Sequence, residues 1–241
     1  MAVTYRSIAT ATGTNNAGSI TINEPSGALT DDLLVACISY HGTSSPTTPS
    51  GWTQVANVFN SNTATGRNSR PSSVMYFRQR GTGATNYTFS GFATSGGSIV
   101  VGGIVALIGT DSGSASVVDN FATQNTSQRR VTGSTGDIVP TVSDGAWVGM
   151  VSGSENIGAT YSNQLLELAS GDVAMTEVAD FGTTAGDDID IMIAYYEGST
   201  TSDDGPMSYN RSVRSSLTAI LALFKPTGGV SGGARSFAVI V

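Results

Sequence analysis

The segment Ser98-Ile-Val-Val-Gly-Gly-Ile-Val-Ala-Leu-Ile-Gly109 contains an uncharged apolar run that has the length of a β-strand. A second run of this kind, Ser216-Leu-Thr-Ala-Ile-Leu-Ala-Leu-Phe-Lys225, occurs much later in the chain. Periodicity alone would also allow a helix over Leu217–Phe224, but the lack of charges within it and the β-rich surroundings favour a strand. We therefore expect two matching central strands, one in each of two related halves.

The composition is typical of a folded β protein. Glycine is abundant, with 30 residues, and only 12% of the residues are charged. Many Thr, Val, Ile and Gly residues favour strands joined by tight turns. A chain of 241 residues fits one large all-β domain or two small ones. We predict an all-β, jelly-roll-like β-sandwich over residues 1–226, with a flexible C-terminal tail strand.

The order of segments predicts two pseudo-repeated halves, at about 19–110 and 137–225. A shared rhythm of turns and strands is the other explanation, because few residue identities support the repeat. The predicted correspondences are Ser19–Ile22 with Asp137–Val142, Leu33–Ile38 with Ala146–Val151, Ser73–Phe77 with Asp188–Tyr196, Asn86–Phe89 with Pro206–Tyr209, and Ile104–Gly109 with Ile220–Lys225.

Two segments call for a separate interpretation. Asn163-Gln-Leu-Leu-Glu-Leu-Ala169 favours one or two turns of helix by propensity, ended by Gly171.

Gly102-Gly103 lies inside a strand pattern. A phosphate-binding loop would need a following helix and, for nucleotides, a lysine, and the sequence has neither at this place. We expect a β-bulge or close packing of sheets at these two glycines.

The C-terminal tail, residues 227–241, differs from the rest of the chain. Its first part is Gly-rich and predicts a flexible linker. The linker leads to Ala234-Arg-Ser-Phe-Ala-Val-Ile-Val241, an apolar segment of strand length that either closes the protein's own sheet or augments a neighbour's. The residues expected to dock on a partner are Phe237, Val239, Ile240 and Val241.

The charge distribution argues against nucleic acid and membranes as partners. The formal net charge is −7, and the arginines form only small local clusters, for which pairing with surface carboxylates is the simplest explanation. The N-terminal residues do not resemble a signal peptide, and no apolar run is long enough to span a membrane. We expect synthesis in a cytoplasm, with the single cysteine, Cys37, buried in a strand.

Motifs for catalysis are missing, and we predict no catalytic residue. A Ser-His-Asp triad would need His41, the single histidine, but no nucleophile elbow precedes a helix. We expect His41 at a strand end, in a polar loop. Glycoside hydrolysis would need two facing carboxylates, and nothing in the sequence pairs Glu167, Glu177 or Glu197.

Metal ligands are also few. A zinc site needs several His or Cys residues, and the chain has one of each. Calcium is the one cofactor that the acidic turns allow, because hard cations prefer carboxylate oxygens. The candidate ligands are Asp187, Asp188, Asp190, Asp203 and Asp204, without the spacing of an EF-hand.

Several short motifs resemble a β-sandwich family of tailed-bacteriophage virion proteins, also found in some bacterial surface proteins. The motifs are Asp32-Leu-Leu-Val-Ala36, Pro49-Ser-Gly-Trp-Thr53, Tyr76-Phe-Arg78, Asn86-Tyr-Thr-Phe-Ser90 and Ile104-Val-Ala-Leu-Ile108. The last eight residues are similar to C-termini of phage structural proteins.

The resemblance implies a non-enzymatic virion component, namely a capsid decoration, head-fibre or tail-associated protein. It would be made in the host cytoplasm and would form a homo-oligomer, with a trimer as one arrangement. Other capsid or tail proteins would be its partners. The second half lacks a matching Gly-Trp-Thr, which counts against strict duplication.

A carbohydrate-binding or adhesive module on a particle or cell surface is the alternative function. In that case the loops Thr43–Thr53 and Gly198–Pro206 would form one contact surface for host glycans.

Overall fold

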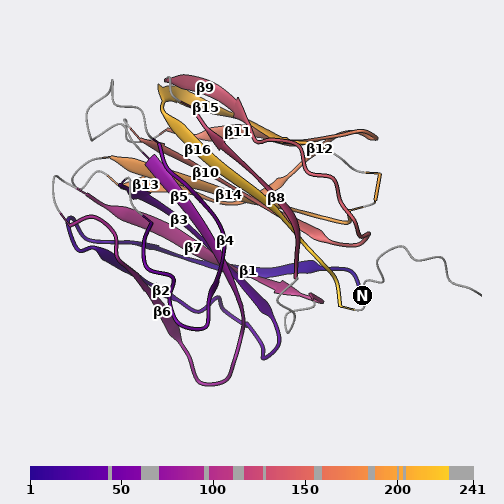
Figure 1. The fold of residues 1–241 in the computed structure, drawn as a ribbon, viewed down its shortest axis with the longest axis horizontal. Helices are drawn as coiled ribbons and strands as arrows, with labels where there is room; N and C mark the ends of the chain where they lie inside the picture. Colours follow the sequence, from indigo (N-terminus) through magenta and orange to yellow (C-terminus); the bar gives the residue numbers. More distant parts are fainter. Residues whose placement is uncertain are drawn as a thin grey trace, which may run out of the picture.

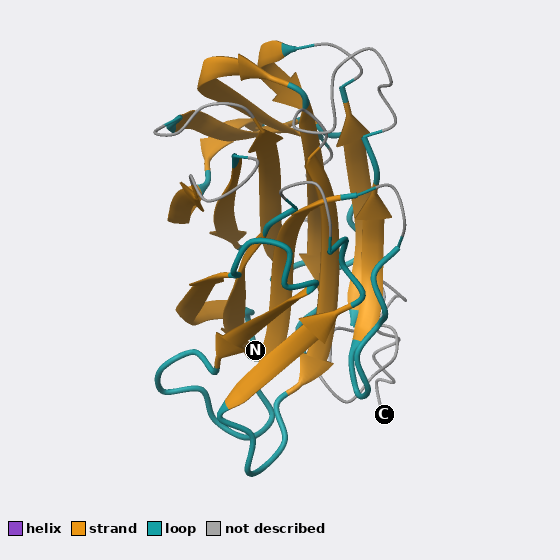
Figure 2. Cartoon of the chain, turned by 90° about the vertical axis from the view of Figure 1, so that its left-hand side faces the viewer, coloured by secondary structure: helices purple, strands orange, loops and turns teal. Residues whose placement is uncertain are grey.

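β-Strands make up the fold in this computed structural model, which describes residues 1–42, 45–60, 71–94, 98–110, 117–126, 129–154, 159–183, 188–199, 201–202 and 205–227. Strands and loops are the only elements in this part of the chain (Figure 2), so none of it forms a helix that could cross a membrane. The first seven strands are β1 (Thr4–Thr12), β2 (Ser19–Asn23), β3 (Leu33–His41), β4 (Thr53–Val58), β5 (Pro71–Gln79), β6 (Asn86–Ser90) and β7 (Val100–Ile108). The other nine are β8 (Val118–Asn125), β9 (Arg130–Ser134), β10 (Ala146–Ser154), β11 (Tyr161–Leu168), β12 (Gly171–Ala174), β13 (Thr176–Thr183), β14 (Ile189–Glu197), β15 (Met207–Ser215) and β16 (Leu217–Phe224).

The strands form four sheets that stack in layers (Figure 1). An outer two-stranded sheet, β2-β6, covers one inner sheet with the order β1-β7-β3-β5-β4. The second inner sheet has the order β13-β14-β10-β16-β8, and an outer sheet of order β12-β11-β15-β9 covers it. Every pairing is antiparallel. The described chain is therefore the all-β sandwich that the sequence predicts, whereas the jelly-roll connectivity stays a prediction.

The inner strands are apolar on both faces because both faces are covered. In β3, Leu33, Val35 and Cys37 point toward the second inner sheet, and Leu34 and Ile38 point toward β2 and β6. All five side chains are fully buried. Cys37 thus has the buried position that was expected for it.

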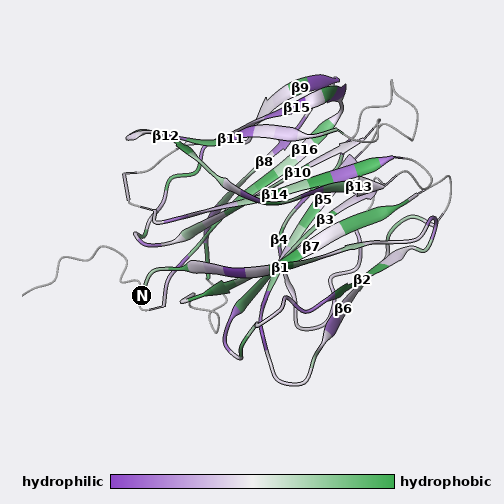
Figure 3. Cartoon of the chain, turned by 180° about the vertical axis from the view of Figure 1, so that it is seen from behind, coloured by the Kyte–Doolittle hydropathy of each residue, from purple (hydrophilic) through white to green (hydrophobic). Residues whose placement is uncertain are grey.

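The two inner sheets share one core. From the second sheet, alternate residues of three neighbouring strands enter this core, namely Ala146, Val148 and Met150 of β10, Ile189, Ile191 and Ile193 of β14, and Ile220, Ala222 and Phe224 of β16. The opposite faces of the same strands carry Trp147, Met192 and Leu221 into a separate core under the outer four-stranded sheet. Figure 3 shows the inner strands largely in green, with purple on β9 and β15.

Hydroxyl groups interrupt the shared core near one end. Ser73 of β5 lies 2.9 Å from the Ser152 hydroxyl of β10 and 2.7 Å from the Thr218 hydroxyl of β16. All three residues are fully buried. Because buried hydroxyls need partners, this cluster favours a single alignment of the two inner sheets.

An aromatic cluster fills the core beneath β2 and β6. Tyr87 and Phe89 face inward from β6, as its alternating sequence predicts, and Trp52 meets both rings edge-on. Arg78 covers the cluster, with its guanidinium carbon 5.7 Å from the Trp52 ring centroid and 5.2 Å from that of Tyr87. Such cation–π contacts attract the guanidinium to the rings while the stem of the arginine covers apolar surface.

The two inner sheets have the same order of strands when β1, β7, β3, β5 and β4 are matched with β8, β16, β10, β14 and β13. In the outer layers, β2 beside β6 matches β9 beside β15, and β11 and β12 are additional in the second half. Four of the five predicted correspondences fall on matched strands in this scheme, and the fifth does not. The pseudo-repeat itself stays a prediction.

The inner sheets also stack in a reciprocal manner. Strand β1 packs against β13, which matches β4, and β4 packs against β8, which matches β1. In the same way, β7 packs against β14 and β5 against β16. The contacts between the two inner sheets therefore have the pattern of a two-fold symmetric interface. In such an interface, when one element contacts a second, the equivalent of the second contacts the equivalent of the first.

Two sequence predictions of local structure are wrong. Residues 163–168 belong to strand β11 rather than a helix, and Ala169 follows in a turn, because pairing with β12 and β15 buries Gln164, Leu166 and Leu168 at a period of two. Residues 137–142 form no strand, and only Ile138 makes an isolated bridge, to Gly205. In the matching of strand orders, β9 takes the position of β2. No strand was predicted at β8, β9, β12 or β13.

Gly102 and Gly103 pack closely without a bulge. The pairing of β3 with β7 runs through both residues without a shift, and the irregularity of this sheet between β1 and β7 lies between Tyr5 and Ser7. A Cβ atom on Gly102 would lie 2.8 Å from the carbonyl oxygen of Cys37. Close packing is therefore the correct one of the two explanations given for these glycines.

Candidate functional site

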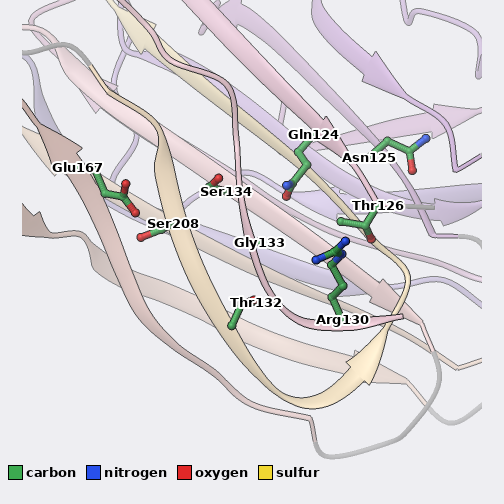
Figure 4. A pocket seen from close by; sticks show the side chains of 9 residues that line it. All are labelled: Gln124, Asn125, Thr126, Arg130, Thr132, Gly133, Ser134, Glu167 and Ser208. Carbon is green, nitrogen blue, oxygen red and sulfur yellow. The ribbon is translucent and has the colours of Figure 1, made fainter. Parts of the chain in front are cut away.

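A polar groove opens between the edges of the two sheets in the second half of the chain. It has a volume of about 500 Å³ and lies between β8, the edge strand of the inner sheet, and β9, the edge strand of the outer sheet (Figure 4). Its lining consists of Gln124, Asn125, Thr126, Arg130, Thr132, Gly133, Ser134, Glu167 and Ser208. Amides, hydroxyls and two side chains of opposite charge therefore line the same groove.

The groove follows β9, with unlike charges toward its two ends. Arg130 pairs in register with Ser215, whereas Ser134 at the other end of β9 pairs with Ser208. Figure 4 shows the Arg130 guanidinium directed toward Thr126 and Glu167 lying on the side of Ser134 and Ser208. A ligand along the groove would thus meet a cationic donor near one end and a carboxylate acceptor near the other.

The charged groups of the groove are not engaged by the protein. Elsewhere in the described chain, ion pairs join Arg6 to Asp32, Arg80 to Glu24, Arg211 to Asp190 and Lys225 to Asp119. Among the described residues, the exposed side chains of Arg130 and Glu167 make no ion pair or hydrogen bond. Both groups are therefore available to a ligand.

The floor of the groove depends on Gly133. The Tyr209 hydroxyl donates a hydrogen bond to the Oε1 atom of Gln124. A Cβ atom at position 133 would lie 2.4 Å from this hydroxyl and 2.6 Å from Gln124 Oε1. Glycine leaves space for the phenol to reach the groove, and burial raises the pKa of Tyr209, which keeps it a donor.

A second polar cluster is buried between the two sheets of the same half. Asp190 of β14 accepts hydrogen bonds from Arg211 of β15 and from the Tyr161 hydroxyl of β11. Arg211 also donates to the Val213 carbonyl oxygen, at 2.8 Å. Gly153 makes room for the cluster, because a Cβ there would lie 2.7 Å from both Arg211 Nε and Asp190 Oδ1.

Burial and neighbouring charges shift the pKa of three groups in and beside this cluster. Burial and the Asp190 carboxylate raise the pKa of Tyr161 well above its ordinary value. Burial opposes the charge of Arg211, but Asp190 raises the pKa of this guanidinium. Burial also raises the pKa of the nearby Asp180, which accepts the backbone N–H of Tyr161 at 3.0 Å. The Arg211 side chain is fully buried and that of Asp190 is 10% exposed, so the ion pair lies almost entirely inside the protein.

Only two of the five calcium candidates, Asp188 and Asp190, lie in the described part of the chain, so the calcium site stays a prediction. Asp190 is engaged by Arg211, so a cation would have to displace a guanidinium to reach it. No group of three or more His, Cys, Asp or Glu side chains is arranged to hold a metal ion among the residues that the structure covers. Asp187, Asp203 and Asp204 lie outside the described residues.

His41 differs from its expected environment. It ends β3 as predicted, but it is 5% exposed rather than placed in a polar loop. Among the described residues, neither ring nitrogen has a hydrogen-bond partner. Burial lowers the pKa of His41 to about 4, so the ring is neutral at pH 7.

The three glutamates considered for hydrolysis lie in separate environments. Glu167 lines the groove, Glu177 accepts a hydrogen bond from Gln164, and Glu197 accepts a hydrogen bond from the backbone N–H of Tyr5.

The arginines of the local clusters have several roles, and not only the pairing with surface carboxylates that the sequence indicates. Arg211 is buried, Arg78 covers aromatic rings, and Arg67 and Arg70 lie outside the described residues.

A second cavity of about 520 Å³ lies where the described chain ends. The Arg6–Asp32 ion pair and Leu29 line it, together with Gly109 and Thr227. The Thr227 backbone N–H donates to the Gly109 carbonyl oxygen at 2.7 Å. The predicted docking residues Phe237, Val239, Ile240 and Val241 follow from this point and lie outside the described residues.

The groove was not foreseen from the sequence. Its residues come from four strands, and β9 itself has a single apolar residue, Val131, so it shows no strand pattern. A comparison of the two predicted halves could have indicated β9, because a second half that repeats the first would have a strand before β10 in the place of β2. Misplacing that strand at 137–142 concealed the edge on which the groove is built.

No protein-family model, curated protein or solved structure matches this chain.

Proposed function

We propose that this chain is a non-enzymatic structural protein of a tailed-phage virion that forms homo-oligomers and docks on capsid or tail proteins. The observation that carries this proposal is the placement of the side chains best suited to catalysis. Asp190, Arg211 and Tyr161 are engaged with one another inside the sandwich, and His41 is buried without a partner. The first three groups connect β11, β14 and β15, and all four residues are buried within the sandwich, which supports a structural role.

The stacked sheets support the same role. Each inner sheet is covered on both faces, so the large apolar surfaces are used within the chain. A particle component of this kind needs a separate means of attachment. We assign attachment to residues 227–241, in which a Gly-rich linker precedes an apolar segment of strand length.

Removal of residues 230–241 tests the docking role. The truncated protein should keep its thermal unfolding midpoint, because residues 1–226 contain the four sheets, and it should be lost from purified particles. A point variant carrying both Phe237→Ser and Val239→Ser should show the same loss, whereas the matched control Ser236→Ala should be incorporated normally. Normal incorporation of the truncated protein would overturn the docking assignment.

The alternative surface for carbohydrate binding, built from Thr43–Thr53 and Gly198–Pro206, is not favoured. The Ser39 hydroxyl, near the end of β3, donates to the Asp190 carbonyl oxygen, near the start of β14. The loop after β3 and the loop after β14 therefore start from opposite ends of the stacked strands. Thr47 also bridges to Ser90, in the first half, and Gly205 to Ile138, in the second.

A further inference from the structure

We propose that the groove along β9 is a binding site for a neutral oligosaccharide. This inference goes beyond the virion role and does not depend on it. It rests on the described residues of the groove, on the groups they leave available, and on a comparison with the matching opening in the first half of the chain.

The fold does not by itself require a polar groove at this place. In the first half, the strand that matches β9 is β2, whose Ile20 and Ile22 lie opposite Phe89 and Tyr87. Both isoleucines are almost fully buried and close the core there. Strand β1, which matches β8, adds the small apolar side chains of Ala9 and Ala11 to the same core.

In the second half, the same positions are polar or empty. Gly133 lies opposite Tyr209, where Ile20 lies opposite Phe89. Gln124 lies on the face of β8 toward the outer sheet, and its Oε1 atom accepts a hydrogen bond from the Tyr209 hydroxyl. The opening that apolar side chains close in one half is thus kept open and lined by polar groups in the other, at the expense of apolar burial.

The available groups match the chemistry of a polyol. The amide nitrogen of Gln124 has no hydrogen-bond partner among the described residues, so it can donate to a ligand. Arg130 adds donors, and the Glu167 carboxylate accepts two hydrogen bonds, as adjacent sugar hydroxyls can supply. The hydroxyl groups of Ser134 and Ser208 act as donors or acceptors.

Charge and shape narrow the class of ligand. Arg130 and Glu167 are the only charged residues of the lining, and their formal charges cancel, which favours an uncharged ligand over a phosphate chain or a polyanion. The volume of about 500 Å³ falls within the roughly 300–1,000 Å³ of small-molecule sites, but the lining is mostly polar, unlike that of sites for apolar ligands. The elongated arrangement along β9 fits an oligosaccharide better than a single sugar.

An array of neutral and acidic glycans of three or more sugar residues, probed with the full chain, tests the proposal. We expect neutral glycans to bind, and isothermal titration of the best one should show the affinity falling about tenfold or more in Arg130→Ala and in Glu167→Ala. This size corresponds to the loss of hydrogen bonds to a charged group. Both side chains are exposed, so the variants should fold normally.

Two matched variants control for nonspecific effects. Arg129→Ala removes the neighbouring arginine, whose side chain donates to the Arg214 carbonyl, and Asp172→Ala removes the acid paired in register with Glu167. Neither residue lines the groove, and both variants should bind within about twofold of the unmodified chain. An array without binders would overturn the proposal, as would binding of acidic glycans alone, or affinity that is unchanged in Arg130→Ala and Glu167→Ala. None of these outcomes bears on particle incorporation.

Discussion

His41 illustrates how burial sets the properties of a single residue in this protein. Its ring is enclosed at the end of β3, and its pKa is lowered to about 4, compared with an ordinary value of about 6.5. The unfolded chain therefore binds a proton below pH 6.5 that the folded chain does not bind until about pH 4. Folding is opposed by protonation throughout this interval.

We predict that the free energy of unfolding falls by about 3 kcal/mol through His41 alone as the pH is lowered from 6.5 to about 4. A His41→Leu variant lacks this contribution. At pH 7.5 it should be at least as stable as the original, because it removes two buried nitrogens without partners. Urea unfolding of both proteins between pH 7.5 and 4 measures the difference, and parallel losses of stability in the two proteins would contradict the prediction.

At the scale of the element, strand β7 shows how closely the inner layers approach one another. Gly102 lies against the backbone of β3, whereas a Cβ on Gly103 would lie 2.9 Å from the Cδ1 methyl of Ile193 in the facing sheet. A methyl at the end of a side chain can move, but a carbonyl within a paired strand cannot move without disturbing the ladder. Two neighbouring glycines are thus needed for different reasons.

Gly102→Ala should therefore destabilise the protein by about 1–3 kcal/mol, as overpacking does. Gly103→Ala should have a smaller effect, because Ile193 can adjust and alanine loses less backbone entropy on folding than glycine. Equilibrium urea unfolding of the two variants gives the comparison. A larger loss for Gly103→Ala would show that the facing sheet, and not β3, limits the space around β7.

Elements with a clear pattern could be predicted from the sequence, and those defined by their partners could not. The two apolar faces of β3 and the alternation of Tyr87 and Phe89 in β6 both indicate burial directly. Strand β11 has Leu, Gln and Glu residues that favour a helix, and only its neighbours in the sheet make it a strand. The groove brings Gln124 of the inner sheet near Ser208 of the outer sheet through the packing of the two sheets, which no local pattern encodes.

At the scale of the molecule, the shared core between the inner sheets connects the two halves. Each half carries one tryptophan in its own outer core, Trp52 beneath β2 and β6, and Trp147 beneath the four-stranded sheet. The core between the sheets takes residues from both halves, so neither half can unfold without exposing the inner face of the other. Unfolding should therefore be cooperative across the whole chain.

Single-tryptophan variants test this cooperativity. In Trp147→Phe the fluorescence reports on the first half, and in Trp52→Phe it reports on the second. Within each variant, we predict that the fluorescence transition in urea coincides with the far-ultraviolet circular dichroism transition. Separate midpoints in either variant would show that the halves unfold independently.

The reciprocal stacking of β1 on β13 and of β4 on β8 has a consequence for how the fold responds to dilution. Two separate chains that met in this way would be a homodimer, and their association would weaken as the protein concentration falls. Here residues 111–116 join the two halves, so the partner is always present at a high effective concentration. The interface between the halves thus persists at the lowest concentrations, before any copy of the chain has met another.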